Sequence, residues 1–317
     1  MSRAYDVAVV GGGPWGIALA RTAARAGSRV VLVSRREIEG ESAAAGSLVV
    51  RPDVIAASEA SLLILAVPSP HVTVFADELA PHLDGAHFVI HGVRGLVGEE
   101  LLSVSDVFRA RTPVRRLGAL GGPTLVPELE AGTPSVIVVG SAFPEVVEAF
   151  RESFASRSLR VYATSDLTGL EWASAVNGAY LIALGYALVS GAGPGLVAAF
   201  TTRAVHELAR VATAAGGERD TLLGLAGLGD LLAGINQTSR PEVLFGKALA
   251  AGKDVKAALA AAGQRIEAVA LLPHLVAWTK RHGVRASILA AIADAVVGGK
   301  SREALIAALM AAPMGSQ

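Results

Sequence analysis

Short apolar runs, separated by glycine, proline and polar turns, mark the first half of the chain. Residues 7–10 and 61–67 are continuous enough to predict parallel strands that are buried on both faces. Residues 29–33 predict another strand, which follows a stretch of helical composition at 17–26. Further short strands are predicted at 87–91, 116–120, 135–140 and 161–162. This alternation favours the α/β class, with one open, mostly parallel sheet.

The second half of the chain has a different pattern. From about residue 165, alanine, leucine and glycine dominate and alternating patterns disappear, which predicts an all-α domain. The longest apolar run, residues 173–189, predicts a helix buried on all sides, and it is shorter than the ~20 residues that a membrane-spanning helix needs. Pro241 predicts the first turn of another helix, with Ser239 or Arg240 near its N-cap. We therefore predict two domains, residues 1–164 and 165–317.

Composition excludes several classes of protein. The 317 residues are 52% hydrophobic and 18% charged with a formal net charge of zero, so nothing in that balance attracts nucleic acid or an anionic membrane. Cysteine is absent, which excludes disulfides, thiolate metal sites and a cysteine nucleophile. His87 and His91 lie four apart on a predicted strand, without the helical geometry of a metal site, so no metal is expected. The first strand begins within seven residues and leaves no room for a signal peptide, so we expect a soluble, cytoplasmic protein without membrane insertion.

A glycine-rich turn follows the first predicted strand and precedes the first predicted helix. Gly11, Gly13 and Gly16 fit the G-x-G-x-x-G pattern in the context that a dinucleotide-binding fold requires. In that fold Gly11 permits the tight turn, Gly13 lets a pyrophosphate approach bare backbone, and Gly16 lets helix and strand pack closely. The helix N-terminus offers unpaired N–H groups and a positive dipole end to the phosphates. The sequence therefore predicts a Rossmann-type domain that binds a nicotinamide dinucleotide.

The residues after the second strand indicate which dinucleotide. An NAD-binding fold usually ends this strand with an acid that accepts the ribose hydroxyls. Here Ser34, Arg35 and Arg36 stand instead, and a guanidinium can bind the 2′-phosphate of NADP in a bidentate manner. We predict that NADP(H) is preferred and that NAD(H) is possible. The alternative is an arginine pair on a solvated turn.

The order of the further motifs is similar to that of one known family. These motifs are Gly-Gly-Gly-Pro-Trp-Gly-Ile-Ala-Leu-Ala (11–20), Leu-Ala-Val-Pro-Ser (65–69), Arg-Gly-Leu (94–96), Gly-Gly-Pro-Thr (121–124), Arg-Val-Tyr (160–162), Thr-Thr-Arg (201–203), Gly-Leu-Ala-Gly-Leu-Gly-Asp-Leu (224–231) and Ser-Arg (239–240). Over nearly its whole length the chain resembles the bacterial type of NAD(P)H-dependent glycerol-3-phosphate dehydrogenase. The resemblance implies a Rossmann-type domain followed by an all-α domain like that of 6-phosphogluconate dehydrogenase. It also implies a homodimer that reduces dihydroxyacetone phosphate, a small anionic substrate, to sn-glycerol 3-phosphate.

The resemblance assigns roles residue by residue. It places the cofactor at Gly11, Gly13, Pro14, Trp15, Gly16, Ser34, Arg35, Arg36, Arg94, Val126, Arg240 and Glu267. It places the substrate at Arg94, Gly122, Thr124, Ser239 and Arg240, with Arg240 in the family's phosphate-binding position. Pro14 stands where a serine or threonine is usual, so one hydroxyl contact is lost. Arg94 replaces a family lysine, and Gly195, Gly234 and Pro241 replace an asparagine, a threonine and an asparagine.

The largest departure concerns catalysis. The family's catalytic lysine and the asparagine after it are replaced here by Asn177 and Gly178. Hydride transfer to a ketone leaves an alkoxide that needs a proton and a nearby positive charge, and an asparagine supplies neither. The remaining catalytic candidates are Asn177 itself, Asp230 if burial keeps it protonated, and Tyr180, three residues along the predicted helix. Tyr180 can equally be an ordinary buried tyrosine. Restoring the Lys-Asn pair at 177–178 is expected to raise turnover.

Two functions remain open from the sequence. The first is an NADP(H)-dependent oxidoreductase of this family with a rebuilt substrate site, acting on a small anionic carbonyl or hydroxyl compound. The family's own reaction in weakened form belongs to that hypothesis. The second is a catalytically silent nicotinamide-dinucleotide-binding protein that senses or scaffolds.

Overall fold

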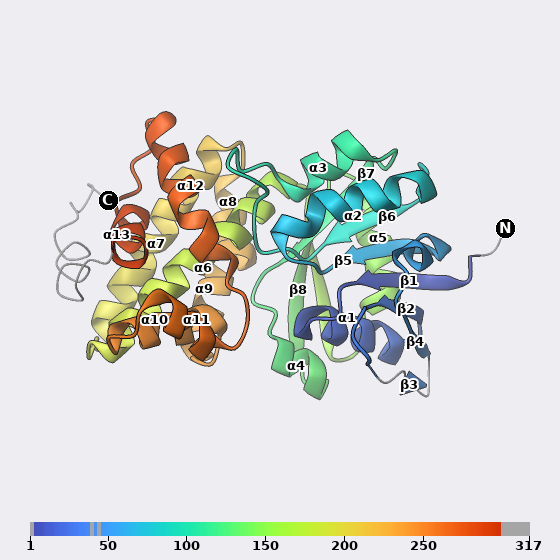
Figure 1. The fold of residues 1–317 in the computed structure, drawn as a ribbon, viewed down its shortest axis with the longest axis horizontal. Helices are drawn as coiled ribbons and strands as arrows, with labels where there is room; N and C mark the ends of the chain where they lie inside the picture. The colour runs from blue at the N-terminus through green and yellow to red at the C-terminus, as the bar shows by residue number, and fades with distance from the viewer. Residues whose placement is uncertain (1–2, 39–40, 43–45, 299–317) are drawn as a thin grey trace. The chain divides into compact units, whose positions relative to one another are not determined.

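The chain forms two compact units. The computed structural model describes residues 3–38, 41–42 and 46–298, and Figure 1 shows its elements. Unit 1 extends to Gly98 and continues over Leu102–Glu171, whereas unit 2 contains Glu99–Leu101 and the chain from Trp172 onward. The division lies inside helix α6 (Leu167–Val189), and the predicted boundary at 164/165 lies just before this helix begins.

Unit 1 is built on a nine-stranded sheet in the order β3-β4-β2-β1-β5-β6-β7-β8-β9. The strands are β1 (Tyr5–Val10), β2 (Arg29–Val33), β3 (Glu41–Ser42), β4 (Ser47–Arg51), β5 (Ala60–Leu65), β6 (Phe88–His91), β7 (Arg116–Gly121), β8 (Ser135–Gly140) and β9 (Leu159–Thr164). The pairs β3–β4 and β7–β8 are antiparallel and all other pairs are parallel. The prediction of an open, mostly parallel α/β sheet is confirmed.

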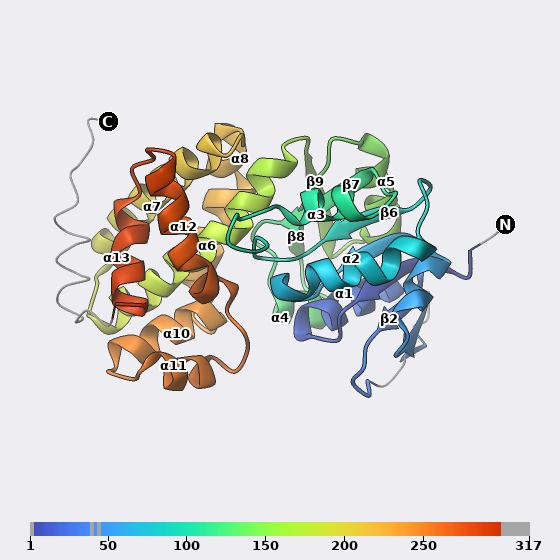
Figure 2. The same cartoon turned by 45° about the horizontal axis from the view of Figure 1, so that its top comes forward.

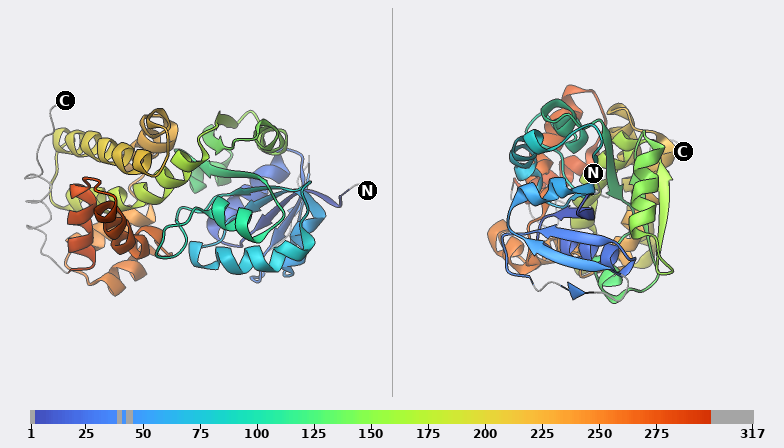
Figure 3. Two further views of the ribbon diagram at one scale, coloured as in Figure 1. Left: turned by 90° about the horizontal axis from the view of Figure 1, so that it is seen from above. Right: turned by 90° about the vertical axis from the view of Figure 1, so that its right-hand side faces the viewer.

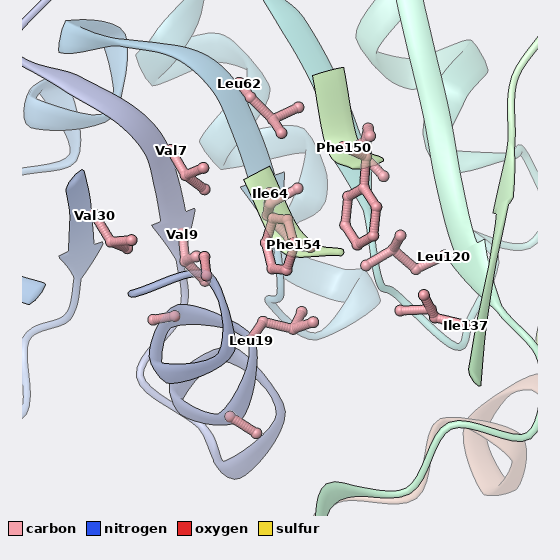
Figure 4. Close-up of a cluster of buried hydrophobic side chains, with 14 of the residues drawn as sticks. Val7, Val9, Leu19, Val30, Leu62, Ile64, Leu120, Ile137, Phe150 and Phe154 are labelled. Carbon is pink, nitrogen blue, oxygen red and sulfur yellow. The ribbon is translucent and has the colours of Figure 1, made fainter. Parts of the chain in front are cut away.

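The sheet of unit 1 is covered on both faces, which explains its continuous apolar strands. Side chains alternate between faces along a strand, and in β1 Val7 and Val9 enter one core while Ala8 and Val10 enter another. The first core includes residues of α1 (Pro14–Arg25), α4 (Val126–Ala131) and α5 (Pro144–Phe154), and the second includes residues of α2 (Val72–Leu79) and α3 (Val104–Arg111). Figure 3 shows helices on both faces, and Figure 4 shows Val7, Val9 and Leu19 in the first core.

Two strands at one edge of the sheet were not predicted from the sequence pattern. Strands β3 and β4 were not predicted, because β4 is half exposed and lacks the continuous apolar run that marks the other strands. The other predicted strands are present within a few residues of their expected bounds.

Unit 2 is helical throughout the described residues, as predicted. After α6 come α7 (Pro194–Ala214), α8 (Arg219–Leu223), a π-helical turn η4 (Leu225–Gly229), α9 (Asp230–Asn236), α10 (Pro241–Ala250), α11 (Val255–Ala262), α12 (Glu267–Arg281) and α13 (Ser287–Val296). Helices α7, α10 and α12 lie around α6 (Figure 2). Gly185 and Gly246 allow α6 and α10 to touch, since a Cβ on either would overlap a backbone carbonyl of the other helix. Proline occupies the first turn of α10 and Arg240 its N-cap, as predicted.

Helix α6 is longer than the apolar run predicted. It has 23 residues and a mean hydropathy of 1.4 in its most apolar window, so by length and composition alone it is long enough to cross a membrane. That window is 83% buried inside the protein, which is typical of the core helix of a soluble domain.

Candidate functional site

The glycine-rich turn is closely packed at Gly11 and Gly16 and open at Gly13. Gly11 has φ of +127°, and a Cβ there would overlap the carbonyl oxygen of Ala66. A Cβ at Gly16 would overlap the carbonyl oxygen of Gly11. Gly13, the N-cap of α1, has no atom within 4 Å of the place where its Cβ would stand. The turn is therefore closed where strand and helix pack and open at Gly13, where a pyrophosphate would approach.

The first turn of α1 has fewer hydrogen-bond donors than the dinucleotide-binding pattern predicts. Pro14 occupies the first helical position, so this helix start lacks a backbone N–H as well as a hydroxyl. Trp15 follows, and its buried Nε1 has no hydrogen-bond partner among the described residues. The indole lies against Gly92, where a Cβ would overlap Nε1. Val126 packs with Trp15 on the same core. These residues fit a dinucleotide, with fewer polar donors than the pattern usually supplies.

The turn after β2 presents two arginines to solvent. Ser34 is buried, and its Oγ accepts the Arg36 N–H at 3.0 Å and donates to the Arg36 carbonyl at 3.2 Å. The hydroxyl thus stabilises the turn. Arg35 and Arg36 are exposed, and neither has an ion-pair partner in the part of the chain that the structure describes. Binding of a 2′-phosphate by these two arginines stays a prediction.

The remaining predicted substrate residues of unit 1 have structural contacts. Gly122 has φ of +89°, and a Cβ there would lie 2.8 Å from Val138 Cγ2. Thr124 is buried, and its Oγ1 donates to the Val136 carbonyl at 2.7 Å. Arg94 is partly buried in the loop after β6. Substrate binding by these residues stays a prediction.

In unit 2, Asn177 lies at the centre of a buried polar cluster. Its Nδ2 donates to Asp230 Oδ2 at 3.1 Å, to the Gly227 carbonyl at 3.1 Å and to the Ala226 carbonyl at 3.4 Å. Both carbonyls belong to the π-helical turn, and the Gly227 carbonyl also accepts the Asp230 N–H, which leaves it one lone pair for the side chain. Only this amide orientation is compatible with the cluster, because the flipped one would point Oδ1 at three acceptors. Asn177 Oδ1 is buried without a partner among the described residues.

The Asp230 carboxylate also binds Arg240. Arg240 Nη2 lies 2.8 Å from Asp230 Oδ1, and Nη1 donates to the Asp230 carbonyl at 3.2 Å. Both side chains are buried, so the Arg240 guanidinium balances the charge of the Asp230 carboxylate. The structure therefore brings Asn177, Asp230 and Arg240 together, as the resemblance implies. Within the cluster, Asn177 has no titratable proton and the Arg240 guanidinium stays protonated.

Two of the departures from the family pattern, Gly178 and Gly234, lie in close packing, and a third, Gly195, does not. A Cβ at Gly178 would lie 2.9 Å from the Ala268 Cβ, and a Cβ at Gly234 would overlap Leu181 Cδ2. Larger side chains at 178 and 234 therefore need their neighbours to move. Gly195 has open space around its Cα, so a side chain fits there.

Tyr180 is engaged away from the Asn177 cluster. Its hydroxyl donates to Glu207 Oε1 at 3.3 Å, and the Glu207 carboxylate accepts the N–H groups of Ile288 and Leu289 at the start of α13. Burial, with the nearby Glu207 charge, raises the pKa of Tyr180 well above its usual range. Burial also raises the pKa of Glu207. These contacts explain a buried tyrosine without a catalytic role.

We expect Tyr180→Phe to leave the rate of NADPH oxidation unchanged. The variant removes one hydrogen bond to a carboxylate that keeps two backbone donors, so the free energy of unfolding should fall by about 1 kcal/mol. Denaturant unfolding and steady-state kinetics on the same preparations measure both effects. A large loss of turnover at unchanged stability would make Tyr180 the proton donor.

Two predicted residues of unit 2 remain to be placed. Ser239 is exposed and donates to Gln237 Oε1 at 3.0 Å, one residue before Arg240. Glu267 begins α12 and pairs with Arg265 at 3.5 Å. Neither contact tests a role toward a ligand. Among the described residues no group of three or more His, Asp or Glu side chains could hold a metal ion.

Sequence reasoning missed a buried pair formed by His91 and Glu171. From the sequence, His91 was considered only as a metal ligand and Glu171 was not considered. The sequence did contain a signal for Glu171, because this acid stands between Leu170 and Trp172 in an apolar helix. In the structure Glu171 is 4% exposed. A carboxylate in that setting needs a partner.

Comparisons with known proteins agree with the two units. Residues 41–147 match the model of the NAD-dependent glycerol-3-phosphate dehydrogenase N-terminus, and residues 166–307 match that of its C-terminus. The chain is 31% identical to a glycerol-3-phosphate dehydrogenase (NAD(P)+) of Parvibaculum lavamentivorans, over all of both chains, and 32% identical to one of Azorhizobium caulinodans, over 98% of each. A crystal structure of glycerol-3-phosphate dehydrogenase from Coxiella burnetii superposes with a TM-score of 0.88 at 25% identity, covering 97% of this chain and 99% of the other.

Proposed function

Because this chain belongs to the NAD-dependent glycerol-3-phosphate dehydrogenase family, we propose that it is an NAD(P)-dependent oxidoreductase acting on a CH–OH group. Its proposed reaction interconverts dihydroxyacetone phosphate and sn-glycerol 3-phosphate. The observation that carries the proposal beyond the family is the Asn177–Asp230–Arg240 cluster, which keeps two members of the family's site and replaces the third.

In this proposal unit 1 binds the cofactor. A bound nicotinamide dinucleotide supplies a hydride to the carbonyl carbon of the ketone or accepts one from the alcohol. The open backbone at Gly13 and the N-terminus of α1 hold the pyrophosphate, and Trp15 lies beside them. Arg35 and Arg36 bind the 2′-phosphate of NADP(H).

Residues of unit 2 hold and polarise the substrate. Arg240 keeps N–H groups beyond the two that bind Asp230, so it can bind a phosphate while Asp230 fixes its position. The resemblance also assigns Arg94, which belongs to unit 1, to the substrate. Asn177 donates both of its N–H hydrogens to Asp230 and the π-helical carbonyls. It therefore neither protonates nor binds a developing alkoxide. The proposed enzyme is therefore slow with dihydroxyacetone phosphate, or it acts on another small anionic substrate.

The same cluster supports a second candidate function. A protein with no proton donor beside Asp230 can bind a nicotinamide dinucleotide and turn nothing over. Such a silent protein would sense the cofactor or serve as a scaffold.

NADPH oxidation with and without dihydroxyacetone phosphate, at high enzyme concentration, separates the two functions. Slow oxidation that depends on the ketone and saturates with it supports the dehydrogenase. Cofactor binding without turnover of any ketone, imine or alcohol supports the silent protein.

We expect NADPH to bind about tenfold or more tightly than NADH, because Arg35 and Arg36 are exposed and can pair with the 2′-phosphate. Replacing both arginines by alanine should abolish this preference and leave the NADH affinity little changed. Arg157→Ala, which removes an exposed arginine before β9, is the control for lost charge. Equal dissociation constants for the two cofactors in fluorescence titrations of the wild type would contradict the prediction.

We further propose a cytoplasmic homodimer, formed largely by unit 2, that does not insert into a membrane. The proposal rests on the resemblance to the family and on the low charge of the chain. Light scattering at micromolar concentration should give twice the mass of 32.3 kDa. A monomeric mass under those conditions would count against it.

A further inference from the structure

One carboxylate oxygen contacts both ends of the loop that carries Arg94. The loop starts after His91, the last residue of β6, and ends where α3 begins. Glu171 Oε1, from the first turns of α6, lies 2.8 Å from His91 Nε2 and accepts the Ser105 N–H at 3.0 Å. The His91 and Glu171 side chains are 4% and 3% exposed. All three residues belong to unit 1.

The hydrogens of this arrangement follow from its partners. The Val93 N–H points to His91 Nδ1 at 3.4 Å, so Nδ1 is the acceptor and Nε2 carries the hydrogen that Glu171 accepts. Ser105 is the second residue of α3, so the Glu171 carboxylate lies at a helix N-terminus, where a negative charge is favoured. Ser103 caps the same helix by accepting the Asp106 N–H. One carboxylate thus joins the end of a strand to the start of a helix.

The first residue of the loop reaches the predicted cofactor site. Gly92 continues the ladder with its N–H to the Leu65 carbonyl at 2.8 Å, and it lies against the Trp15 indole. Arg94 follows two residues later. A displacement of His91 would therefore move the backbone that supports both Trp15 and Arg94.

We propose that Glu171 is a positioning residue that, through His91 and Ser105, fixes the loop at residues 92–103 and thereby Arg94. The part that concerns Arg94 as a ligand rests on the proposed function. Neither His91 nor Glu171 contacts the substrate or cofactor in this proposal. Their effect on binding is transmitted through the loop.

Hydrogen exchange tests the loop directly and needs no activity. In His91→Leu, amides of residues 92–103 should exchange about tenfold faster or more, because a buried hydrogen bond to a charged group is lost. His91→Gln, which keeps an N–H near the Nε2 position, should restore most of the protection. Ser28→Ala is the control, since it removes a partly buried hydrogen bond to the Ser153 carbonyl just before β2 and should leave the loop unchanged. Unchanged loop exchange in His91→Leu would overturn the proposal.

A double-mutant cycle tests the effect on Arg94. Calorimetry measures binding of sn-glycerol 3-phosphate to protein saturated with NADPH, a complex in which both partners are reduced and no turnover occurs. We expect Arg94→Ala to weaken binding about tenfold, His91→Leu several-fold, and the double variant no more than Arg94→Ala alone. Additive losses would show that His91 acts independently of Arg94 and would overturn the positioning role. If the wild type does not bind glycerol 3-phosphate, the proposed substrate is wrong, and loop exchange, with the same cycle run on NADPH affinity, decides the role of Glu171.

Discussion

Replacing Asn177 with lysine should raise the turnover of dihydroxyacetone phosphate about tenfold or more above a wild type whose turnover is very low. General acid catalysis is typically worth ~10²–10⁴-fold in rate, and loss of alkoxide stabilisation can cost about as much again. The acceptors around Asn177 Nδ2 are one carboxylate and two carbonyls, the groups to which an ammonium donates. A lysine at 177 is two atoms longer than asparagine, so residues around this buried position have to shift before its Nζ can donate to them.

Asn177→Met is the matched control for this experiment. Methionine adds similar volume to the buried site without a charge or a proton, so it should not raise turnover. NADPH oxidation measured for the three proteins at high enzyme concentration decides the result. If the wild type already turns over at ~10 per second, another group supplies the proton and this account of the site is wrong. A lysine variant no faster than the methionine variant would indicate a site rebuilt for different chemistry.

The sequence favours adding Gly178→Asn to Asn177→Lys, but the structure argues against this second substitution. An asparagine at 178 would bring its Cβ within 2.9 Å of the Ala268 Cβ, and α6 and α12 would have to move apart. Overpacking of this kind typically costs ~1–3 kcal/mol. Any gain from the restored asparagine would be mixed with that strain, so the single variant is the cleaner test.

The second large effect is expected in the glycine-rich turn, where two similar substitutions should fail for different reasons. Gly13→Ala should weaken NADPH binding about 100-fold, or ~2.8 kcal/mol, because the added methyl occupies the open side where a pyrophosphate approaches. Gly13 has φ of −84°, which any residue adopts, so the free energy of unfolding should stay the same or rise by up to ~1 kcal/mol. Gly16→Ala should lose both stability and binding, since its Cβ would overlap the Gly11 carbonyl oxygen.

Fluorescence titration and denaturant unfolding of both variants measure the two effects. The separation of binding from stability in Gly13→Ala is the informative outcome. Full NADPH affinity in that variant would show that no phosphate lies against Gly13, and the proposed cofactor position would have to be abandoned.

The fold was largely predictable because its signals are local. Adjacent residues are enough to predict strand β1 and the turn after it. The helices of the second half are predicted from local composition, without reference to tertiary contacts. Strand β4 escaped because its half-exposed residues form no continuous apolar run. The antiparallel pair β7–β8 also escaped, because strand direction depends on chain connection and not on side-chain pattern.

For the candidate site, the sequence predicted which residues belong to it but not how they contact one another. The resemblance selected Asn177, Asp230 and Arg240 from distant segments, and the structure brings them together. The number of acceptors around Asn177 could not be predicted, since two of them are backbone carbonyls of a π-helical turn about 50 residues away in the chain. Glu171 was missed for a related reason, because its partners lie 80 and 66 residues earlier in the chain.

The contact between Gly178 and Ala268 also restricts the mutational paths open to the gene. An asparagine codon becomes a lysine codon by a single base change, so position 177 can return to lysine in one step. Position 178 cannot follow freely, because any side chain there meets the Ala268 methyl at 2.9 Å. Glycine is the only residue smaller than alanine. Position 268 would therefore have to become glycine before position 178 could accept asparagine without strain. A lysine at 177 is therefore one base change away, whereas an asparagine at 178 also needs a change at its neighbour 268.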